Sequence, residues 1–167
     1  MKLFFVLAIS FGFVISQAAA QQRVQRGSFN TVLNVILKHN VKERTVPEAI
    51  TRKNAIFLDA REKKEYQISH IRNAVYVGYD SFNVAALKNV GKESEIIVYC
   101  SIGKRSEKIT QKLNAAGYRN VSNLYGGIFE WVNQGHEVVN INNKSTTRVH
   151  AYGKFWGHWL DRGEKVY

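Results

Sequence analysis

Cysteine, proline and methionine each occur only once in this sequence of 167 residues. The single cysteine, Cys100, excludes an internal disulfide and any zinc site built from several thiolates. The five histidines lack the spacing of metal ligands, and no phosphate-binding or dinucleotide-binding fingerprint is present. No stretch has the biased composition of a disordered or low-complexity segment. The sequence therefore predicts one ordered domain without a metal or a bound cofactor.

Long hydrophobic runs are also scarce, and only one occurs, at residues 3–16. It follows Met1 and Lys2 and precedes three alanines at residues 18–20. A positive start, an apolar run and small residues form the pattern of a secretory signal peptide. We therefore expect residues 1–20 to be cleaved before Gln21, and the alternative is an uncleaved membrane anchor. Cleavage predicts an exported protein, periplasmic in a Gram-negative bacterium, without stable membrane insertion.

Acidic residues are few: the sequence has 13 Asp and Glu residues but 24 Lys and Arg residues, which gives a formal net charge of +11. The basic residues are scattered and form no run of the nucleic-acid-binding type, so we expect no nucleic acid partner. A positive surface still attracts small anions through its long-range field. We expect a monomeric protein with a basic surface.

Short apolar runs alternate with helical patterns through the middle of the chain. Predicted strands lie at residues 55–58, 74–77, 95–99 and 120–124. Predicted helices lie at residues 46–52, 62–68, 81–88, 106–116 and 128–133. This alternation predicts an α/β fold with a parallel sheet. Residues 21–44 are predicted to form an N-terminal lead-in with one helix, at residues 28–38.

The end of the chain, residues 141–167, is rich in aromatic residues. One face of a helix is predicted by aromatic side chains at i, i+3, i+4 and i+7, namely Tyr152, Phe155, Trp156 and Trp159. We expect this C-terminal extension to pack back on the domain. The alternative is a docking face for a partner.

The only cysteine lies between the predicted strand at residues 95–99 and the predicted helix at 106–116. In parallel α/β sheets, sites form at the carboxyl ends of strands, where Asp59 also lies. Backbone N–H groups, the helix start and two cations would stabilise a Cys100 thiolate and an anionic substrate. The alternative is a buried structural cysteine. The predicted active-site loop consists of Cys100, Ser101, Ile102, Gly103, Lys104, Arg105 and Ser106.

Four motifs follow one another between residues 45 and 139. They are LDARE at 58–62, SHIRNA at 69–74, VYCSIGKRS at 98–106 and LYGGIFEW at 124–131. Together they resemble the motifs of a single-domain rhodanese, and the predicted domain is residues 45–140. The resemblance implies a three-layer α/β fold, in which helices flank a central parallel sheet on both faces. Ser69 and Asn73 replace the usual glycines of the second motif.

The same resemblance implies an activity, the transfer of a sulfane sulfur through a Cys100 persulfide. The donor would be a small anion such as thiosulfate, and the acceptor would be cyanide, a thiol or a protein. Lys104 and Arg105 are expected to contact the anionic donor. With no second cysteine, the persulfide must pass its sulfur to another molecule.

Three motif residues, Asp59, Arg61 and His70, are expected to support the site rather than to react. Arg61 and Glu65 lie four residues apart, a spacing at which side chains meet on a helix surface. We therefore expect these two side chains to pair on the surface of the predicted helix.

Two other functions remain open at this point. Related dual-specificity phosphatases share the fold but use a Cys-x5-Arg loop, whereas this chain has the spacing Cys100-x4-Arg105. The shorter loop favours attack on a single sulfur atom over binding of a phosphate. A non-catalytic binding or sulfur-carrier module is the second alternative.

Overall fold

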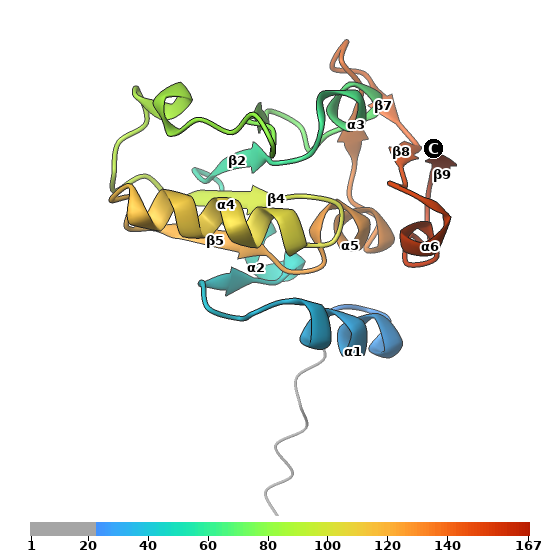
Figure 1. Cartoon of the computed structure of the whole chain (residues 1–167). Helices are drawn as coiled ribbons and strands as arrows, with labels where there is room; N and C mark the ends of the chain where they lie inside the picture. Colours follow the sequence, from blue (N-terminus) through green and yellow to red (C-terminus); the bar gives the residue numbers. More distant parts are fainter. Residues whose placement is uncertain (1–22) are drawn as a thin grey trace, which may run out of the picture.

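The computed structural model describes residues 23–167, so the predicted signal peptide lies outside the described residues. Helices connect the strands of a central five-stranded sheet, and a C-terminal part with short strands of its own follows (Figure 1). The central strands are β1 (Glu43–Arg44), β2 (Ile56–Asp59), β3 (Val75–Tyr76), β4 (Ile96–Tyr99) and β5 (Val121–Leu124). The helices around them are α1 (Gly27–Ile36), α2 (Val46–Ile50), α3 (Lys63–Ile68), η1 (Val84–Leu87), α4 (Lys104–Ala115) and α5 (Gly127–Asn133). The C-terminal elements are β6 (Val138–Val139), β7 (Ser145–Thr146), β8 (Arg148–His150), α6 (Lys154–Gly157) and β9 (Glu164–Val166).

Neighbouring strands of the central sheet all run parallel, in the order β1-β5-β4-β2-β3. Asp59, the last residue of β2, pairs with Tyr99, the last residue of β4. The chain therefore leaves these two neighbouring strands at the same edge of the sheet, and Cys100 follows directly. This edge is the carboxyl end of the strands, where parallel α/β sheets build their sites.

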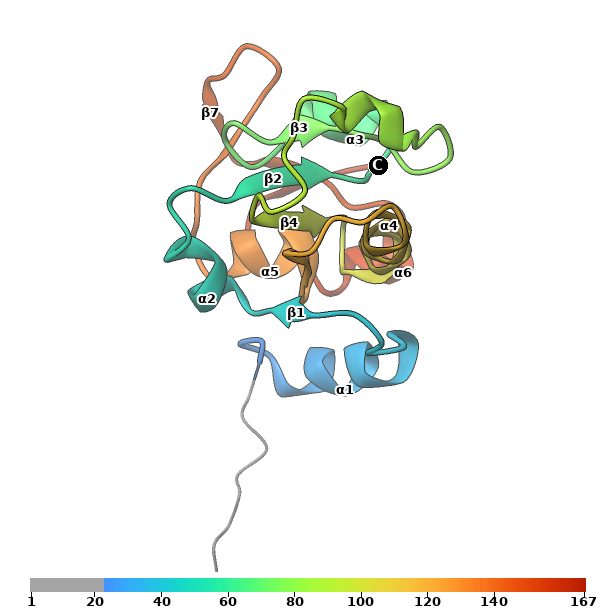
Figure 2. The same ribbon diagram turned by 90° about the vertical axis from the view of Figure 1, so that its left-hand side faces the viewer.

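Helices cover both faces of the sheet, which gives three layers (Figure 2). The side chains of β4 show how, because successive residues of a strand point to opposite faces. Ile97 and Tyr99 belong to one core with residues of α1, α2 and α5. Ile96 and Val98 belong to a second core with residues of η1 and α4. The predicted parallel α/β sheet with helices on both faces is confirmed.

Some helices and strands differ from the sequence-based prediction. Residues 81–88 contain only the short 3-10 helix η1 instead of an α-helix. β1 was not predicted, because two residues are too few to show a strand period, and its pairing with β5 joins the lead-in to the sheet. α4 begins at Lys104, two residues early, since Gly103 takes the N-cap position with a φ of 109°. Within residues 23–167, no helix is long and apolar enough to span a membrane.

The C-terminal extension lacks the continuous aromatic helix that the spacing predicted. α6 has only four residues, and Tyr152 lies before it with a left-handed φ of 63°. Trp156 and Trp159 pack on the main core, and the Trp159 ring stacks on Phe29 with ring centroids 5.3 Å apart. β8 precedes α6 in the chain and β9 follows it, and the two strands pair in parallel. Two of the four aromatic side chains, Trp156 and Trp159, thus pack on the domain, whereas Tyr152 and Phe155 are exposed.

Candidate active site

The sole cysteine lies directly after β4, in a loop that leads into α4. Its side chain is buried, and only 1% of Cys100 is exposed. The Gly103 N–H donates a hydrogen bond to Cys100 Sγ at 3.2 Å. This loop conformation needs Gly103, because its φ of 109° is one that side chains with a Cβ rarely adopt. A backbone donor and the N-terminus of α4 together stabilise negative charge on this sulfur.

The N-terminus of α5 holds the backbone of the cysteine loop. The Ile128 N–H donates to the Cys100 carbonyl oxygen at 2.9 Å, and the Phe129 N–H donates to that of Ser101 at 3.1 Å. Gly127 makes this approach possible, since a Cβ on it would lie 2.4 Å from the Cys100 carbonyl oxygen. The sequence indicates only a turn at this glycine. Its contact with the cysteine loop is a tertiary feature that the sequence-based reasoning missed.

Arg105 of the cysteine loop and Glu65 form a largely buried ion pair. Arg105 Nη1 donates to Glu65 Oε2 at 2.7 Å, and Arg105 Nη2 donates to Oε1 at 2.8 Å. Ser101 Oγ joins the pair, because it accepts from Arg105 Nη2 at 3.0 Å and donates to Glu65 Oε1 at 3.1 Å. The prediction that Arg61 and Glu65 pair on a helix surface is wrong. Both residues are buried, and each has a different partner.

The Arg105–Glu65 pair also sets the charge beside the sulfur. Burial is the largest single influence on the pKa of Arg105 and lowers it, but the Glu65 hydrogen bond and the Cys100 thiolate charge raise that pKa above its usual value. Burial raises the pKa of Glu65, yet the hydrogen bond and charge of Arg105, with the charge of Arg61, hold it below its usual value. At neutral pH the guanidinium is therefore charged and lies within electrostatic reach of Cys100.

Two further loop residues are held by neighbouring elements. Lys104 Nζ donates to the carbonyl oxygen of Ile36, the last residue of α1. The side chain of Ile102 is buried in the main core. Lys104 and Arg105, which we expected to contact an anionic donor, thus each bind an oxygen of the protein. Both residues also line the cavity in front of Cys100, so their positive charges lie near an anion that enters it.

A short chain of hydrogen bonds ties the start of α4 to β5. Ser106 Oγ donates to Asn123 Oδ1 at 2.6 Å, and Asn123 Nδ2 donates to the Gly103 carbonyl oxygen at 3.0 Å. Asn123 is completely buried, and nothing in its sequence context marks it as part of the site. The Ser106 hydroxyl therefore supports the backbone of the loop through Asn123.

Asp59 and Arg61 form a second ion pair, and neither side chain is exposed. Arg61 Nη2 lies 2.6 Å from Asp59 Oδ2 and also donates to the Ser69 carbonyl oxygen at 2.6 Å. The pair thereby fastens the end of β2 to the turn after α3. Among the described residues, neither side chain forms a hydrogen bond to the cysteine loop.

His70 holds the chain that follows α3. It exchanges backbone hydrogen bonds of 2.8 and 2.9 Å with Val139, and its ring stacks on Tyr66 with ring centroids 3.9 Å apart. The two replaced glycines of this motif flank the same turn. Ser69 is extended, with a φ of −163°, and needs no glycine. Asn73 has a left-handed φ of 63°, which asparagine tolerates better than most residues.

A cavity of about 150 Å³ lies in front of Cys100. Its walls are the cysteine loop and two aromatic residues of the C-terminal extension, Tyr152 and Trp156. The guanidinium carbon of Arg105 lies 4.8 Å from the centre of the Tyr152 ring. The sequence predicts that these aromatic residues pack on the domain, but it gives no signal that they border the cysteine.

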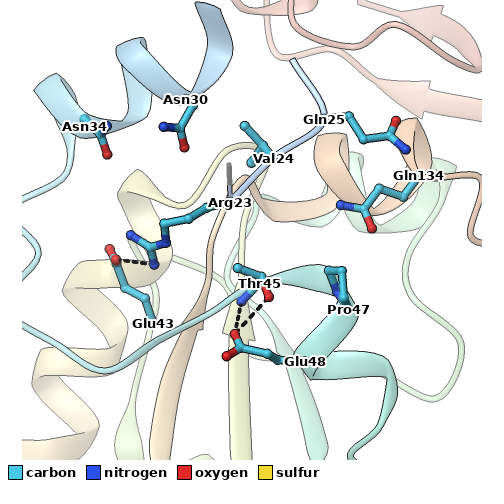
Figure 3. A pocket seen from close by; sticks show the side chains of 10 residues that line it. All are labelled: Arg23, Val24, Gln25, Asn30, Asn34, Glu43, Thr45, Pro47, Glu48 and Gln134. Carbon is cyan, nitrogen blue, oxygen red and sulfur yellow. Dashed lines mark hydrogen bonds and ion pairs between the residues drawn. The ribbon is translucent and has the colours of Figure 1, made fainter. Parts of the chain in front are cut away.

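A larger cavity of about 750 Å³ lies beside α1 and the start of α2 (Figure 3). Arg23 borders it and binds Glu43 at 2.7 Å, while Thr45 and Glu48 on another wall hydrogen-bond each other. Of the described residues that line it, none belongs to the cysteine loop. Within residues 23–167, no group of three or more His, Cys, Asp or Glu residues is placed to hold a metal ion. Of these two cavities, only the smaller one is lined by Cys100.

Several solved structures share the fold. A protein of Bacillus halodurans aligns with a TM-score of 0.56 at 24% identity, over 66% of this chain and 85% of its own. A thiosulfate sulfurtransferase from Pseudomonas aeruginosa aligns with a TM-score of 0.57 at 22% identity, over 80% of this chain and 26% of its own. A rhodanese-like domain from Anabaena sp. aligns with a TM-score of 0.51 at 25% identity, over 56% of this chain and 70% of its own.

Curated relatives are similar in sequence but much longer. A tRNA uridine(34) hydroxylase of Hamiltonella defensa subsp. Acyrthosiphon pisum (strain 5AT) is 37% identical over 132 residues, which cover 75% of this chain and 35% of the relative. The protein of the same name from Photorhabdus laumondii is 30% identical over 102 residues, which cover 58% of this chain and 29% of the relative. The chain thus spans about a third of the length of these relatives.

The family of rhodanese-like domains matches residues 44–134, more than half of the chain. The matched part begins in β1, ends just after α5 and contains the cysteine loop, Glu65 and Gly127. The resemblance that the four sequence motifs suggested is thereby confirmed. The chain belongs to the family of rhodanese-like domains.

Proposed function

We propose that the protein is a sulfurtransferase that carries a sulfane sulfur on Cys100. In the first step, the Cys100 thiolate attacks the outer sulfur of a donor such as thiosulfate. An S–S bond forms to Sγ, the S–S bond of thiosulfate breaks, and sulfite leaves with the bonding electron pair. In the second step, cyanide or a thiolate attacks the outer sulfur of the persulfide and releases the Cys100 thiolate. No external oxidant or reductant is consumed.

The observation that carries the proposal is the Gly103 N–H bond to Cys100 Sγ inside a cavity that two cations line. The backbone donor stabilises a sulfur anion without a histidine base. The charge of Arg105 favours the thiolate and attracts an anionic donor. The cavity of about 150 Å³ is roughly five times the ~30 Å³ share of a liquid water molecule, a size suited to thiosulfate.

Intact-mass measurement after incubation with thiosulfate tests the first step. The wild-type protein should gain the mass of one sulfur atom, and this gain should disappear on addition of cyanide as thiocyanate is formed. Cys100→Ser should gain nothing under the same conditions. If no sulfane donor adds sulfur to the wild-type protein, the proposal is refuted.

Hydroxylation of a uridine in tRNA is a second candidate, favoured by the similarity to the two curated relatives. This chain spans about a third of those proteins, and the cavity at Cys100, of about 150 Å³, is below the ~300 Å³ at which ligand-sized pockets begin. Nucleoside mass spectrometry of tRNA from cells with and without the gene separates the candidates. Hydroxylated uridine that depends on the gene would favour this second activity.

The phosphatase and carrier alternatives are separated by assays of turnover. Both Nη atoms of Arg105 donate to Glu65, which leaves its forked end poorly available to a phosphate. A phosphatase would release phosphate from an aryl phosphate. A non-catalytic carrier would take up one sulfur and fail to turn over with an acceptor. A sulfurtransferase forms thiocyanate repeatedly from thiosulfate and cyanide.

We further propose that the protein is exported as a monomer after cleavage at the alanines of residues 18–20. N-terminal sequencing of protein expressed from the full sequence in a Gram-negative bacterium should begin at Gln21, with the product in the periplasmic fraction. Retention of residues 1–20 would favour an anchored form instead. Sedimentation equilibrium of the cleaved product measures its oligomeric state.

A further inference from the structure

Two aromatic side chains line the cavity in front of Cys100. Of the described residues that line this cavity, only Tyr152 and Trp156 come from outside the cysteine loop. Both belong to the C-terminal extension, which lies beyond the part of the chain that matches the family. Figure 1 shows α6 and the β8–β9 pair beyond the tip of β4, where the cysteine loop lies. An incoming substrate therefore meets two rings as well as two cations.

The position of Tyr152 is determined by its surroundings. Its φ of 63° is left-handed, a conformation that a residue with a Cβ keeps only where neighbouring groups hold it. The Tyr152 N–H donates to Nδ1 of the buried His150 at 3.0 Å, and His150 ends β8, which is paired with β9. The Tyr152 ring lies against the Arg105 guanidinium, with 4.8 Å from the guanidinium carbon to the ring centre. These contacts hold the Tyr152 ring beside Arg105, at the wall of the cavity.

Adjacent residues of α6 have different environments. Trp156 packs against the main core and borders the cavity. Phe155 is 72% exposed, and it contacts the edge of Trp156 without lining the cavity. The extension thus presents one aromatic residue to the site and the next one to solvent. Phe155 is for this reason a matched control for the removal of an aromatic side chain.

We propose that Tyr152 and Trp156 select the substrates of Cys100 by size. They admit small anions and low-molecular-weight thiols, and they exclude the thiols of folded proteins and the bases of nucleic acids. This inference rests on the proposed sulfur transfer. Because only 1% of Cys100 is exposed, a reactant must pass between the rings and the loop to reach Sγ. The cavity of about 150 Å³ then limits what can stand beside the sulfur.

The first test compares two variants with one control. Tyr152→Gly removes the ring and suits the left-handed backbone, so it is the variant that best preserves the fold. Trp156→Ala opens the other wall, and Phe155→Ala is the control. The measured quantity is kcat/KM for benzenethiosulfonate divided by kcat/KM for thiosulfate, with cyanide as acceptor. We expect this ratio to rise on the order of tenfold in Tyr152→Gly and Trp156→Ala, and to stay unchanged in Phe155→Ala.

A second test needs no sulfur transfer. Cys100 is the only thiol, so its alkylation by iodoacetamide and by a fluorescein-bearing maleimide can be followed by mass. The rate with the bulky reagent, divided by that with the small one, should rise in Tyr152→Gly and Trp156→Ala but not in Phe155→Ala. An unchanged ratio in Tyr152→Gly, folded by circular dichroism, would overturn the size selection. If sulfur transfer fails while the alkylation ratio rises, the proposed function is refuted, but the size selection by Tyr152 and Trp156 is supported.

Discussion

Glu65 binds Arg105 through both carboxylate oxygens, at 2.7 and 2.8 Å, although 40 residues separate the two in the chain. The pair joins α3 to α4 beside Cys100, and Ser101 bridges it from within the cysteine loop. Its geometry orients the guanidinium and keeps its charge close to the sulfur. Glu65 therefore fixes the position of Arg105, whose charge lies within electrostatic reach of Cys100.

Replacement of Glu65 by glutamine should destabilise the protein by about 3 kcal/mol, because it leaves the largely buried Arg105 charge without a counter-charge. The side chains of Arg105 and Glu65 are only 14% and 1% exposed. Urea denaturation measures the change in unfolding free energy. Glu93→Gln is the control, since Glu93 pairs with Arg119 at the surface and should lose less than about 1 kcal/mol. Equal losses in the two variants would contradict the importance of burial.

Gly127→Ala should abolish most sulfur transfer and destabilise the fold. An added Cβ would stand 2.4 Å from the Cys100 carbonyl oxygen and 2.6 Å from that of Ser101, so the cysteine loop must move. Gly117→Ala is the matched control, because Gly117 has a φ of 88° but no atom within 4 Å of its would-be Cβ. The control should lose about 1–2 kcal/mol through left-handed strain alone and keep its activity. Retained activity in Gly127→Ala would show that loop geometry is unimportant.

Acidification below pH 6.5 should weaken the fold through His150. Burial lowers the pKa of His150 below its usual 6.5. The charge of Glu65 opposes this shift, and the positive charges of Lys64, Arg61 and Arg105 add to it. The unfolded chain then binds the proton at higher pH than the folded chain. The contribution of His150 to the stability of the fold is therefore fully present above pH 6.5, and it is lost as the pH falls towards the pKa of His150 in the folded protein.

Asparagine at position 150 offers a test of this titration, because its side-chain oxygen can accept the Tyr152 N–H in place of Nδ1. The unfolding free energy should fall more steeply in the wild-type protein than in His150→Asn as the pH is lowered from 7 through 6.5. Parallel pH profiles for the two proteins would assign the acid sensitivity to other groups.

Asp59→Asn should destabilise the protein by about 3–5 kcal/mol, because the fully buried Arg61 would keep its charge without a partner. The double variant Asp59→Leu with Arg61→Met should recover much of this loss, since it removes both charges and fills the space with apolar atoms. A double-mutant cycle in urea, with Asp59→Leu and Arg61→Met as its single variants, measures the coupling between the two side chains. No recovery in the double variant would show that the neighbouring Ser69 contact matters more than the charge.

The layered sheet could be predicted because its signals are local. Strands that are buried on both faces are mostly apolar, and the apolar runs at residues 55–58 and 96–99 mark β2 and β4. β5 is less regular, because it also buries Ser122 and Asn123. The position of Cys100 after β4 was predictable for the same reason, since the turn from strand to helix involves adjacent residues. β1 was not predicted, because its two residues, Glu43 and Arg44, are charged and give no apolar signal.

The surroundings of the sulfur were not predictable in this way. The separation of four residues suggested Arg61 as the partner of Glu65, but in the folded protein Glu65 pairs with Arg105 of the cysteine loop. The aromatic spacing suggested a helix through Tyr152, but contacts with His150 and Arg105 hold that residue in a left-handed turn. Periodicity records which residues are apolar, and it cannot show which distant groups fix the backbone.

The sequence by itself determined the parallel sheet, the helices on its faces and the place of the thiol in the chain, because these depend on apolar periodicity and adjacent residues. Only the tertiary structure decided which carboxylate orients Arg105, which glycine lets α5 approach the cysteine loop, and how large the cavity in front of Cys100 is. These features depend on proximity in space, because Glu65, Gly127 and the aromatic wall of the cavity lie far from Cys100 in the chain.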